Sequence, residues 1–204
     1  MALHRFELLG GDPVLDFLNT IHDYTREPRR DYIPSFDEAL RWGVAAGVLS
    51  TAESRGAAAL DDGDELGRLT DLRSTLERIS GALVSGRAPT PTDLDSLSAA
   101  FAEATSAARL HRARTGMLER TISTEDAGAA VLRLRVVDSA VALMTSARVG
   151  RLKRCAGCGW FFVDETKNGS RRWCSMATCG ASAKSRRYYR KTRARQPRGR
   201  TLDG

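Results

Sequence analysis

Residues 154–193 have the sequence RCAGCGWFFVDETKNGSRRWCSMATCGASAKSRRYYRKTR, which holds all four cysteines of the 204-residue chain. Two residues separate Cys155 from Cys158, fifteen separate the two pairs, and four separate Cys174 from Cys179. Two close pairs of thiolates joined by a short loop suit a tetrahedral Zn²⁺ site, because each pair can bind one side of the ion. Four thiolates leave no open coordination position, so we expect one structural zinc ion.

Two other interpretations of the cysteines are open at this point. A redox dithiol at Cys155 and Cys158 would be typical of a βαβ pattern, which the surrounding sequence lacks, and it leaves the second pair unexplained. The other alternative is four unrelated buried cysteines. Zinc accounts for all four residues together, and it is the interpretation that we adopt.

The sequence around the cysteines predicts a treble-clef-like finger. The expected order is a knuckle at the first cysteine pair, a strand over 160–163, a turn at Asn168-Gly169, a return segment over 170–173 and a helix that begins at Cys174, with Cys179 near its first turn. Because so small a unit buries little apolar surface, zinc binding would supply a large part of its folding free energy.

The charge of the chain is divided unevenly. The whole chain has a net charge of +7 and a pI near 9.7. Residues 1–150 hold 17 basic and 22 acidic residues, a net charge of −5, whereas residues 151–204 hold 15 basic and 3 acidic ones, a net charge of +12. This asymmetry indicates a polyanionic partner at the basic end, typically nucleic acid. A solvated, disordered tail that only aids solubility is the alternative.

The basic residues near the C-terminus fit a nucleic-acid-binding helix. Residues three or four apart share one side of a helix, so two adjacent basic rows form after Cys179, with Tyr188 and Tyr189 between them. Phosphate contacts from such rows give affinity, and arginine can also pair with guanine edges in the major groove. Alternatively, a tyrosine packs on the finger while the arginines face water. The candidate nucleic-acid-binding residues are Arg171, Arg172, Lys184, Arg186, Arg187, Arg190, Lys191 and Arg193.

Residues 1–150 show the periodicity of helices. Leucine and isoleucine recur at steps of three and four along 64–84, and a Ser-x-x-Glu capping box at Ser35 and Glu38 marks another helix start. The helix expected over 125–149 is apolar around much of its circumference, which favours a central position. We expect helices over 35–50, 64–84, 92–109 and 125–149, a short helix or turn over 57–60, and a short hairpin around Gly116 within 110–123.

The predicted fold is mainly α, with a helical N-terminal domain and a small C-terminal treble-clef-like zinc finger made of a short β-hairpin and a basic helix. We place the helical domain at 1–150, the finger at 151–195 and a flexible basic tail at 196–204. The sequence has no apolar run of roughly 18 residues that could cross a membrane, and its N-terminus lacks the features of a signal peptide. We therefore expect a cytoplasmic protein without a membrane partner, and disulfides are rare in that compartment.

The finger segment resembles the CGNR-type zinc finger of bacterial regulators. Besides the four cysteines, the matching positions are Phe162, Asp164, Gly169, Arg171, Arg172, Trp173, Ser175, Met176, Gly180 and Lys184. The chain departs from the family pattern at Ala181-Ser182, where Asn-Arg is usual. If that arginine contacts DNA in relatives, this chain lacks one such contact.

The N-terminal part carries a second resemblance. The segment GGDPVLDFLNT at 10–20, together with Asp31-Tyr32-Ile33 and Arg41-Trp42, is similar to the helical ABATE domain that precedes this finger in the same family. The two resemblances span nearly the whole chain. They imply a stress-linked transcription regulator with a zinc finger that binds DNA.

A small-molecule site in the helical domain is a further expectation. Asp16, Asn19 and His22 are spaced three apart, and on one helix they would share a side and offer polar groups to a ligand. Trp42 belongs to the same candidate site, because it lies in one of the resembling motifs. In the alternative interpretation, these residues tie helix ends or fill the core. The sequence has no Ser-His-Asp order, phosphate-binding loop or HExxH motif, so we expect no catalytic residues.

Three functions follow from these patterns. The first is a DNA-binding, non-enzymatic transcription regulator whose helical domain senses a small-molecule effector or mediates oligomerisation, for instance as a homodimer. The second is an RNA- or ribosome-associated protein that uses the same basic finger. The third is an enzyme in the helical domain, which only Asp16, Asn19 and His22 support. We adopt the first, with double-stranded DNA as the expected partner and Zn²⁺ as the expected cofactor.

Overall fold

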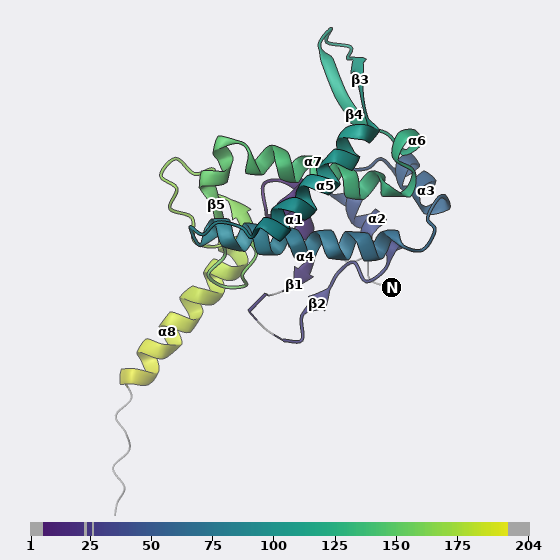
Figure 1. Cartoon of the computed structure of the whole chain (residues 1–204). Coiled ribbons are helices and arrows are strands. Elements are labelled where there is room, and N and C mark those ends of the chain that lie inside the picture. The colour runs from purple at the N-terminus through teal and green to yellow at the C-terminus, as the bar shows by residue number, and fades with distance from the viewer. Residues whose placement is uncertain (1–5, 23, 26, 196–204) are drawn as a thin grey trace, which may run out of the picture.

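The computed structural model describes residues 6–22, 24–25 and 27–195, and the predicted flexible tail at 196–204 lies outside them. Figure 1 shows a mainly helical body from which a β-hairpin and a long C-terminal helix project. None of the helices described is both long enough and apolar enough to cross a membrane. The elements, in chain order, are α1 (Pro13–Leu18), β1 (Ile21–His22), β2 (Arg30–Asp31), α2 (Phe36–Ala45), α3 (Thr51–Ala59), α4 (Glu65–Val84), α5 (Pro91–Ala107), β3 (Ala108–Arg112), β4 (Leu118–Ile122), α6 (Thr124–Ala127), η1 (Gly128–Ala130), α7 (Val131–Met144), η2 (Ala147–Arg151), β5 (Leu152–Arg154), β6 (Phe161–Val163), η3 (Met176–Gly180) and α8 (Ala181–Arg195).

Side-chain hydrogen bonds mark where α2 and α3 begin. The Ser35 hydroxyl accepts from the backbone N–H of Glu38 at 3.2 Å, so α2 begins where the sequence predicted. Ser50 and Glu53 form a complete capping box, and α3 therefore begins at Thr51 and not near residue 57 as expected. The earlier start was missed because the first turns of α3 carry no large apolar residues that would show helical periodicity.

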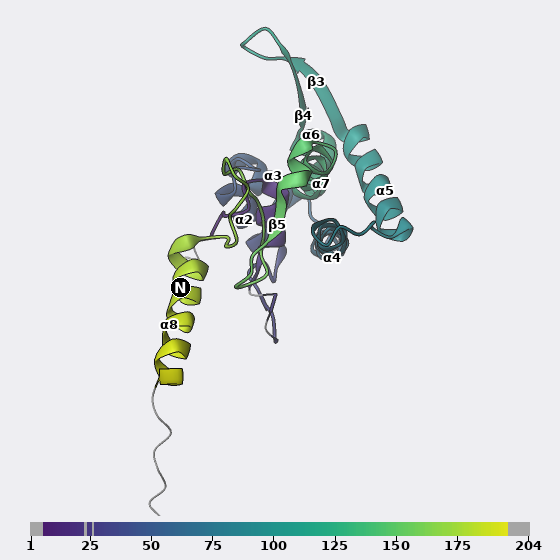
Figure 2. The same cartoon turned by 90° about the vertical axis from the view of Figure 1, so that its left-hand side faces the viewer.

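Helix α7 lies at the centre of the body, as the sequence predicted. Its residues Val131, Leu132 and Val137 are fully shielded from solvent. Helices α1, α4 and α5 pack against it, and Figure 2 shows α4 and α5 beside it. The leucine and isoleucine stripe of α4 faces this core through Leu76 and Ile79.

The prediction of a single helix over 125–149 is wrong. The structure instead has the short helix α6, the 3₁₀ turn η1, the helix α7 and the 3₁₀ turn η2. Gly128 follows α6 with a positive φ of 57°, which glycine adopts at little cost and which interrupts the helix. After α7, the Ser146 hydroxyl accepts from the backbone N–H of Arg148 and caps η2. Apolar residues continue across the first break, which is why periodicity alone suggested one helix.

Antiparallel hairpins complete the fold. Strands β3 and β4 form the hairpin expected around Gly116, and Figures 1 and 2 both show it projecting from the body. In the finger, β6 pairs with β5, so that Leu152 lies opposite Val163 and Arg154 lies opposite Phe161. The finger hairpin thus encloses the first cysteine pair.

The expected return segment over 170–173 is therefore not the partner of β6. These four residues lie within the described part of the chain and form no strand. Two backbone groups of Arg171 bond to side chains: its N–H donates to Asp164 at 2.8 Å, and its carbonyl accepts from Lys153 at 3.2 Å. Strand pairing is a tertiary contact, and the local sequence does not determine which neighbouring segment supplies the partner.

Candidate functional site

The sulfur atoms of the four cysteines converge at one point. All four Sγ atoms lie within 4.8 Å of one another, with Cys158 and Cys174 at 3.6 Å and Cys174 and Cys179 at 3.7 Å. A tetrahedral site with Zn–S bonds of about 2.3 Å separates its sulfurs by about 3.8 Å. The four cysteines form a site for one structural zinc ion.

Tight turns position both cysteine pairs. Between β5 and β6, the N–H of Gly159 donates to the carbonyl of Cys155 at 2.9 Å, and Gly159 has a φ of 78°. A Cβ at this glycine would lie 2.9 Å from Cβ of Tyr24, so the turn also needs glycine for close approach to the body. Cys179 lies in the π-helical turn η3, which Ser175 caps and which continues into α8. The predicted helix after Cys174 is thus present, with its first turn wider than an α-helix.

A partly buried ion pair between Lys153 and Asp164 holds the loop between the cysteine pairs. Nζ of Lys153 donates to the fully buried carboxylate of Asp164 at 2.7 Å, and to the carbonyls of Gly169 and Arg171. Asp164 also accepts from Thr166 and from the backbone N–H of Arg171. The Lys153 ammonium holds the pKa of Asp164 well below its usual range. The loop therefore returns to the metal site by side-chain bonds and not by a second strand.

The finger is joined to the helical body through β6. Asn19 donates to the carbonyl of Phe161 at 2.9 Å and accepts from its N–H at 2.9 Å. The indole of Trp160 donates to the carbonyl of Ile21 at 2.7 Å, and the N–H of Val163 donates to the carbonyl of Gly10 at 2.9 Å. Phe161 is fully buried in the same core as the helices. The two parts of the molecule thus share one core.

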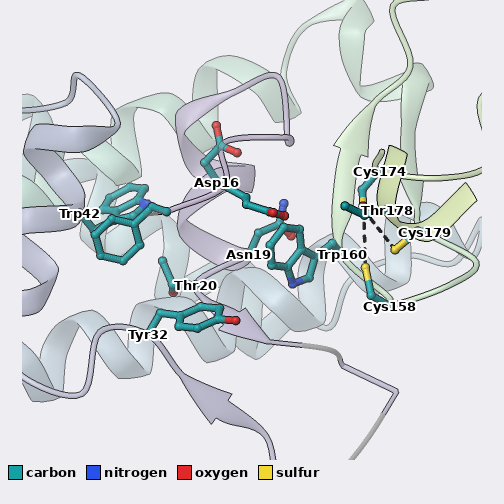
Figure 3. A pocket seen from close by; sticks show the side chains of 12 residues that line it. Asp16, Asn19, Thr20, Tyr32, Trp42, Cys158, Trp160, Cys174, Thr178 and Cys179 are labelled. Carbon is teal, nitrogen blue, oxygen red and sulfur yellow. Dashed lines mark hydrogen bonds between the residues drawn. The ribbon is translucent and has the colours of Figure 1, made fainter. Parts of the chain in front are cut away.

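A cavity of about 330 Å³ lies where the finger meets the helical body. Its lining runs from Trp42 at one end to Cys158, Cys174 and Cys179 at the other, with Asn19 and Trp160 between them (Figure 3). The Asp16 carboxylate also lines this cavity, and burial raises its pKa to about 6. The site therefore offers an aromatic wall and a carboxylate in a partly desolvated space.

Comparison with known protein families finds matches to two of them, which together cover most of the chain. Residues 11–147 match the ABATE family, which is described as "Putative stress-induced transcription regulator". The chain belongs to the ABATE family. Residues 151–192 match the CGNR zinc finger, which agrees with the four-cysteine geometry. No curated protein matches the chain. The family descriptions therefore support a regulator, and the expected resemblance is confirmed.

Within the ABATE domain, the expected grouping of three polar residues on one helix is wrong. Helix α1 ends at Leu18, Asn19 is its C-cap, and His22 lies in strand β1. Asn19 is engaged by Phe161, so its main role is to join the two parts of the chain. Asp16 accepts from the backbone N–H of Gly10 at 2.8 Å and still lines the cavity. The side chain of His22 is outside what the structure describes.

Asn19, Asp16 and Trp42 nevertheless meet at one cavity, together with residues that the sequence did not single out as ligand contacts. Trp160 and Thr178 of the CGNR finger line it beside the zinc ligands. More than 110 residues of sequence separate these two groups, and only the fold brings them together. Local spacing within each motif carries no signal of this contact.

The basic helix of the CGNR finger is exposed. Lys184, Arg186, Arg187 and Arg190 of α8 lie on the surface, and Figures 1 and 2 show α8 leading away from the body. Lys191 and Arg193 also belong to α8, although their side chains are outside the described part. Tyr188 and Tyr189 are 67% and 71% exposed, which contradicts the alternative in which a tyrosine packs on the finger.

Arg171 and Arg172 are neighbours with different surroundings. The Arg171 guanidinium donates to the carbonyls of Trp173 and Cys174 and lies 4.5 Å from the ring centroid of Phe162. Arg172 is exposed, with its guanidinium 5.6 Å from the ring centroid of Trp173. Ala181 and Ser182, which replace the usual Asn-Arg of the CGNR pattern, are exposed at the start of α8.

Proposed function

We propose that this chain is a cytoplasmic, non-enzymatic transcription regulator that contacts double-stranded DNA through its zinc finger and α8, and that its ABATE domain senses a small-molecule ligand. The observation that carries the DNA contact is the composition of α8. Its 15 residues include seven lysines or arginines and no acidic residue. A surface with this much positive charge is favourable for a polyanion and unfavourable for most other partners.

The dimensions of α8 support duplex DNA as the polyanion. A 15-residue α-helix is roughly 22 Å long and fits the major groove, which is about 12 Å wide. Because the zinc site joins the start of α8 to the finger and β6 joins the finger to the body, the helix has a fixed base. The acidic region 1–150, with its net charge of −5, would face away from the phosphates.

Fluorescence anisotropy with duplex DNA at several salt concentrations tests this contact. The variant Arg186→Ala/Arg187→Ala/Arg190→Ala should lower affinity and make the slope of log K against log salt shallower by up to about 3, since each phosphate contact contributes about 0.9. The control is Arg55→Ala/Arg87→Ala/Arg114→Ala, which removes the same charge from exposed positions of the body. Binding that ignores salt, or that both variants weaken equally, would refute the proposal.

RNA is a second candidate partner, and the exposed rings of Tyr188 and Tyr189 favour it. Their centroids lie 6.0 Å apart at an interplanar angle of 74°, so two aromatic faces are open to unpaired bases. Competition between a DNA duplex and a structured RNA distinguishes the two partners. If RNA displaces the duplex and Tyr189→Ala abolishes that advantage, the RNA function replaces the DNA function.

The ABATE domain could mediate oligomerisation instead of sensing a ligand. Leu110, Met117 and Leu118 of the projecting β3–β4 hairpin are 68–70% exposed, and such apolar exposure favours an interface between copies. Light scattering on the whole protein and on Met117→Ser/Leu118→Ser tests this role. A dimer that the double variant converts to a monomer would support it, whereas a monomer in both cases would leave ligand sensing as the proposed role.

A further inference from the structure

One residue that lines the cavity between the two parts of the molecule, Trp42, has an unsatisfied hydrogen-bond donor. Trp42 is fully buried, and its indole Nε1–H has no hydrogen-bond partner among the described residues. A buried N–H without a partner is unfavourable, and a bound acceptor atom would remove that cost. The arrangement is typical of a site whose ligand supplies an oxygen to the indole.

The other residues that line the cavity favour a positively charged ligand. Phe6, Tyr32 and Trp160 add three further aromatic rings, and Glu7 adds a second carboxylate to that of Asp16. No lysine, arginine or histidine contributes to the lining among the described residues. Aromatic faces attract organic cations, and the attraction strengthens when the cation is desolvated. An anionic ligand would face two carboxylates without a compensating charge.

The charge of the zinc site agrees with this sign, and two guanidiniums lie beside lining residues: Arg30 is 5.4 Å from the ring centroid of Tyr32, and Arg73 contacts Thr20. Four thiolates with one Zn²⁺ carry a formal charge of −2, and Cys158, Cys174 and Cys179 border the cavity. The guanidinium of Arg73 donates to Thr20 at 2.8 Å, but it is paired with the Asp31 carboxylate. Its charge is therefore neutralised locally.

We propose that the cavity binds a small organic ammonium ion that also carries an oxygen acceptor, with the ammonium held by the aromatic rings and the Asp16 carboxylate and the oxygen accepting from Trp42. This inference rests on the ligand-sensing part of the proposed function and is independent of DNA binding. Because the lining comes from both the ABATE domain and the finger, the ligand would contact both parts at once.

Three related probes test the proposal with the zinc-loaded full chain. Choline carries both the ammonium and the oxygen, tetramethylammonium carries only the ammonium, and 3,3-dimethyl-1-butanol is the neutral isostere of choline. Binding is followed by tryptophan fluorescence, since Trp42 and Trp160 line the cavity, and by the thermal shift. We expect saturable binding of choline, weaker binding of tetramethylammonium, and binding of the neutral alcohol weaker than that of choline by about tenfold or more.

Two variants test whether Asp16 and Trp42 contact the ligand. Asp16→Asn keeps an acceptor for the N–H of Gly10 but removes the charge, and it should weaken binding of both ammonium probes by about tenfold. Trp42→Phe removes the indole N–H, and it should lower the affinity for choline to that for tetramethylammonium. Asp37→Asn, at an exposed position of α2, is the charge-matched control and should change neither affinity.

Three results would overturn the proposal: no saturable binding of either ammonium probe, equal binding of choline and its neutral isostere, or unchanged affinity in Asp16→Asn. Circular dichroism and zinc content establish that each variant is folded. If Trp42→Phe does not fold, the probe comparison and Asp16→Asn still decide the outcome. The anisotropy titration with DNA contains no ammonium probe, so failure of this inference and failure of DNA binding are observed separately.

Discussion

Strand β6 and helix α8 belong to the same zinc finger, but one is buried in the body and the other is open to solvent. Phe161 and Phe162 of β6 are 0% exposed, whereas Tyr188 and Tyr189 of α8 are 67% and 71% exposed. Backbone groups of β6 bond to Asn19 and to the N-terminal segment of the body. Figures 1 and 2 show α8 leading away from that body.

This difference shows that the two halves of the finger have different roles. The half that contains β6 is part of the core and fixes the position of the zinc site relative to the helices. The half that contains α8 keeps its aromatic rings and at least four cationic side chains on the surface, where they are free to meet a partner. The zinc site lies between the two halves, so it joins a structural element to an exposed one.

Loss of the zinc site should have the largest effect on this arrangement. Cys174→Ser should abolish zinc binding, which contributes about 10 kcal/mol or more to the folding of small zinc units. Because β6 lies in the shared core, the variant should also lower the Tm of the whole body and not unfold the finger alone.

Zinc content by mass spectrometry and thermal unfolding by circular dichroism check this prediction. Met176→Ser changes an exposed residue two positions away and should keep both zinc and Tm. Retention of one equivalent of zinc by Cys174→Ser would show that the ligand set is wrong.

Truncation of an aromatic residue should lower stability strongly in the half that contains β6 and hardly at all in the half that contains α8. Phe161→Ala removes a fully buried ring and should lower the free energy of unfolding by about 3–5 kcal/mol. Tyr189→Ala removes an exposed ring and should change it by less than about 0.5 kcal/mol. Urea unfolding of both variants measures the difference, and equal effects would contradict the contrast between β6 and α8.

The Asp16 carboxylate should make stability depend on pH. Its folded pKa of about 6 lies above the ordinary value of 3.8, so the folded state holds its proton more tightly than the unfolded state. Stability from this group is therefore greatest at low pH and is lost as pH rises through 6. The shift corresponds to at most about 3 kcal/mol at pH 8.

Asp16→Asn has no such titration and should be more stable than the parent chain at pH 8, with the difference shrinking toward pH 5. Chemical unfolding of both proteins between pH 5 and 8 measures it, and Asp37→Asn serves as the control. If the difference is constant with pH, burial does not raise this pKa. A gain in stability together with the loss of ammonium binding would indicate that the carboxylate is retained for function.

The sequence predicted the features that depend on local spacing. The cysteine intervals indicated the zinc site, and the Ser-x-x-Glu pattern at Ser35 located the start of α2. The joint between the two parts depends on Asn19 and Phe161, which are 142 residues apart, and no periodicity connects them. The same limit explains the wrong partner for β6, because strand pairing is chosen by tertiary packing.

Substitutions of the adjacent residues Arg171 and Arg172 test the contrast between the buried and the exposed half of the finger at its smallest scale. Arg171→Lys should lower the free energy of unfolding by about 1–2 kcal/mol, because an ammonium cannot bond to both carbonyls of Trp173 and Cys174 while it stacks on Phe162. Arg172→Lys keeps the charge of an exposed side chain and should change stability by less than about 0.5 kcal/mol. Urea unfolding gives both free-energy changes. DNA affinity measured on the same samples distinguishes an arginine that stabilises the finger from one that contacts DNA. If Arg172→Lys costs as much stability as Arg171→Lys, the boundary between the buried and the exposed half of the finger does not fall between these two residues.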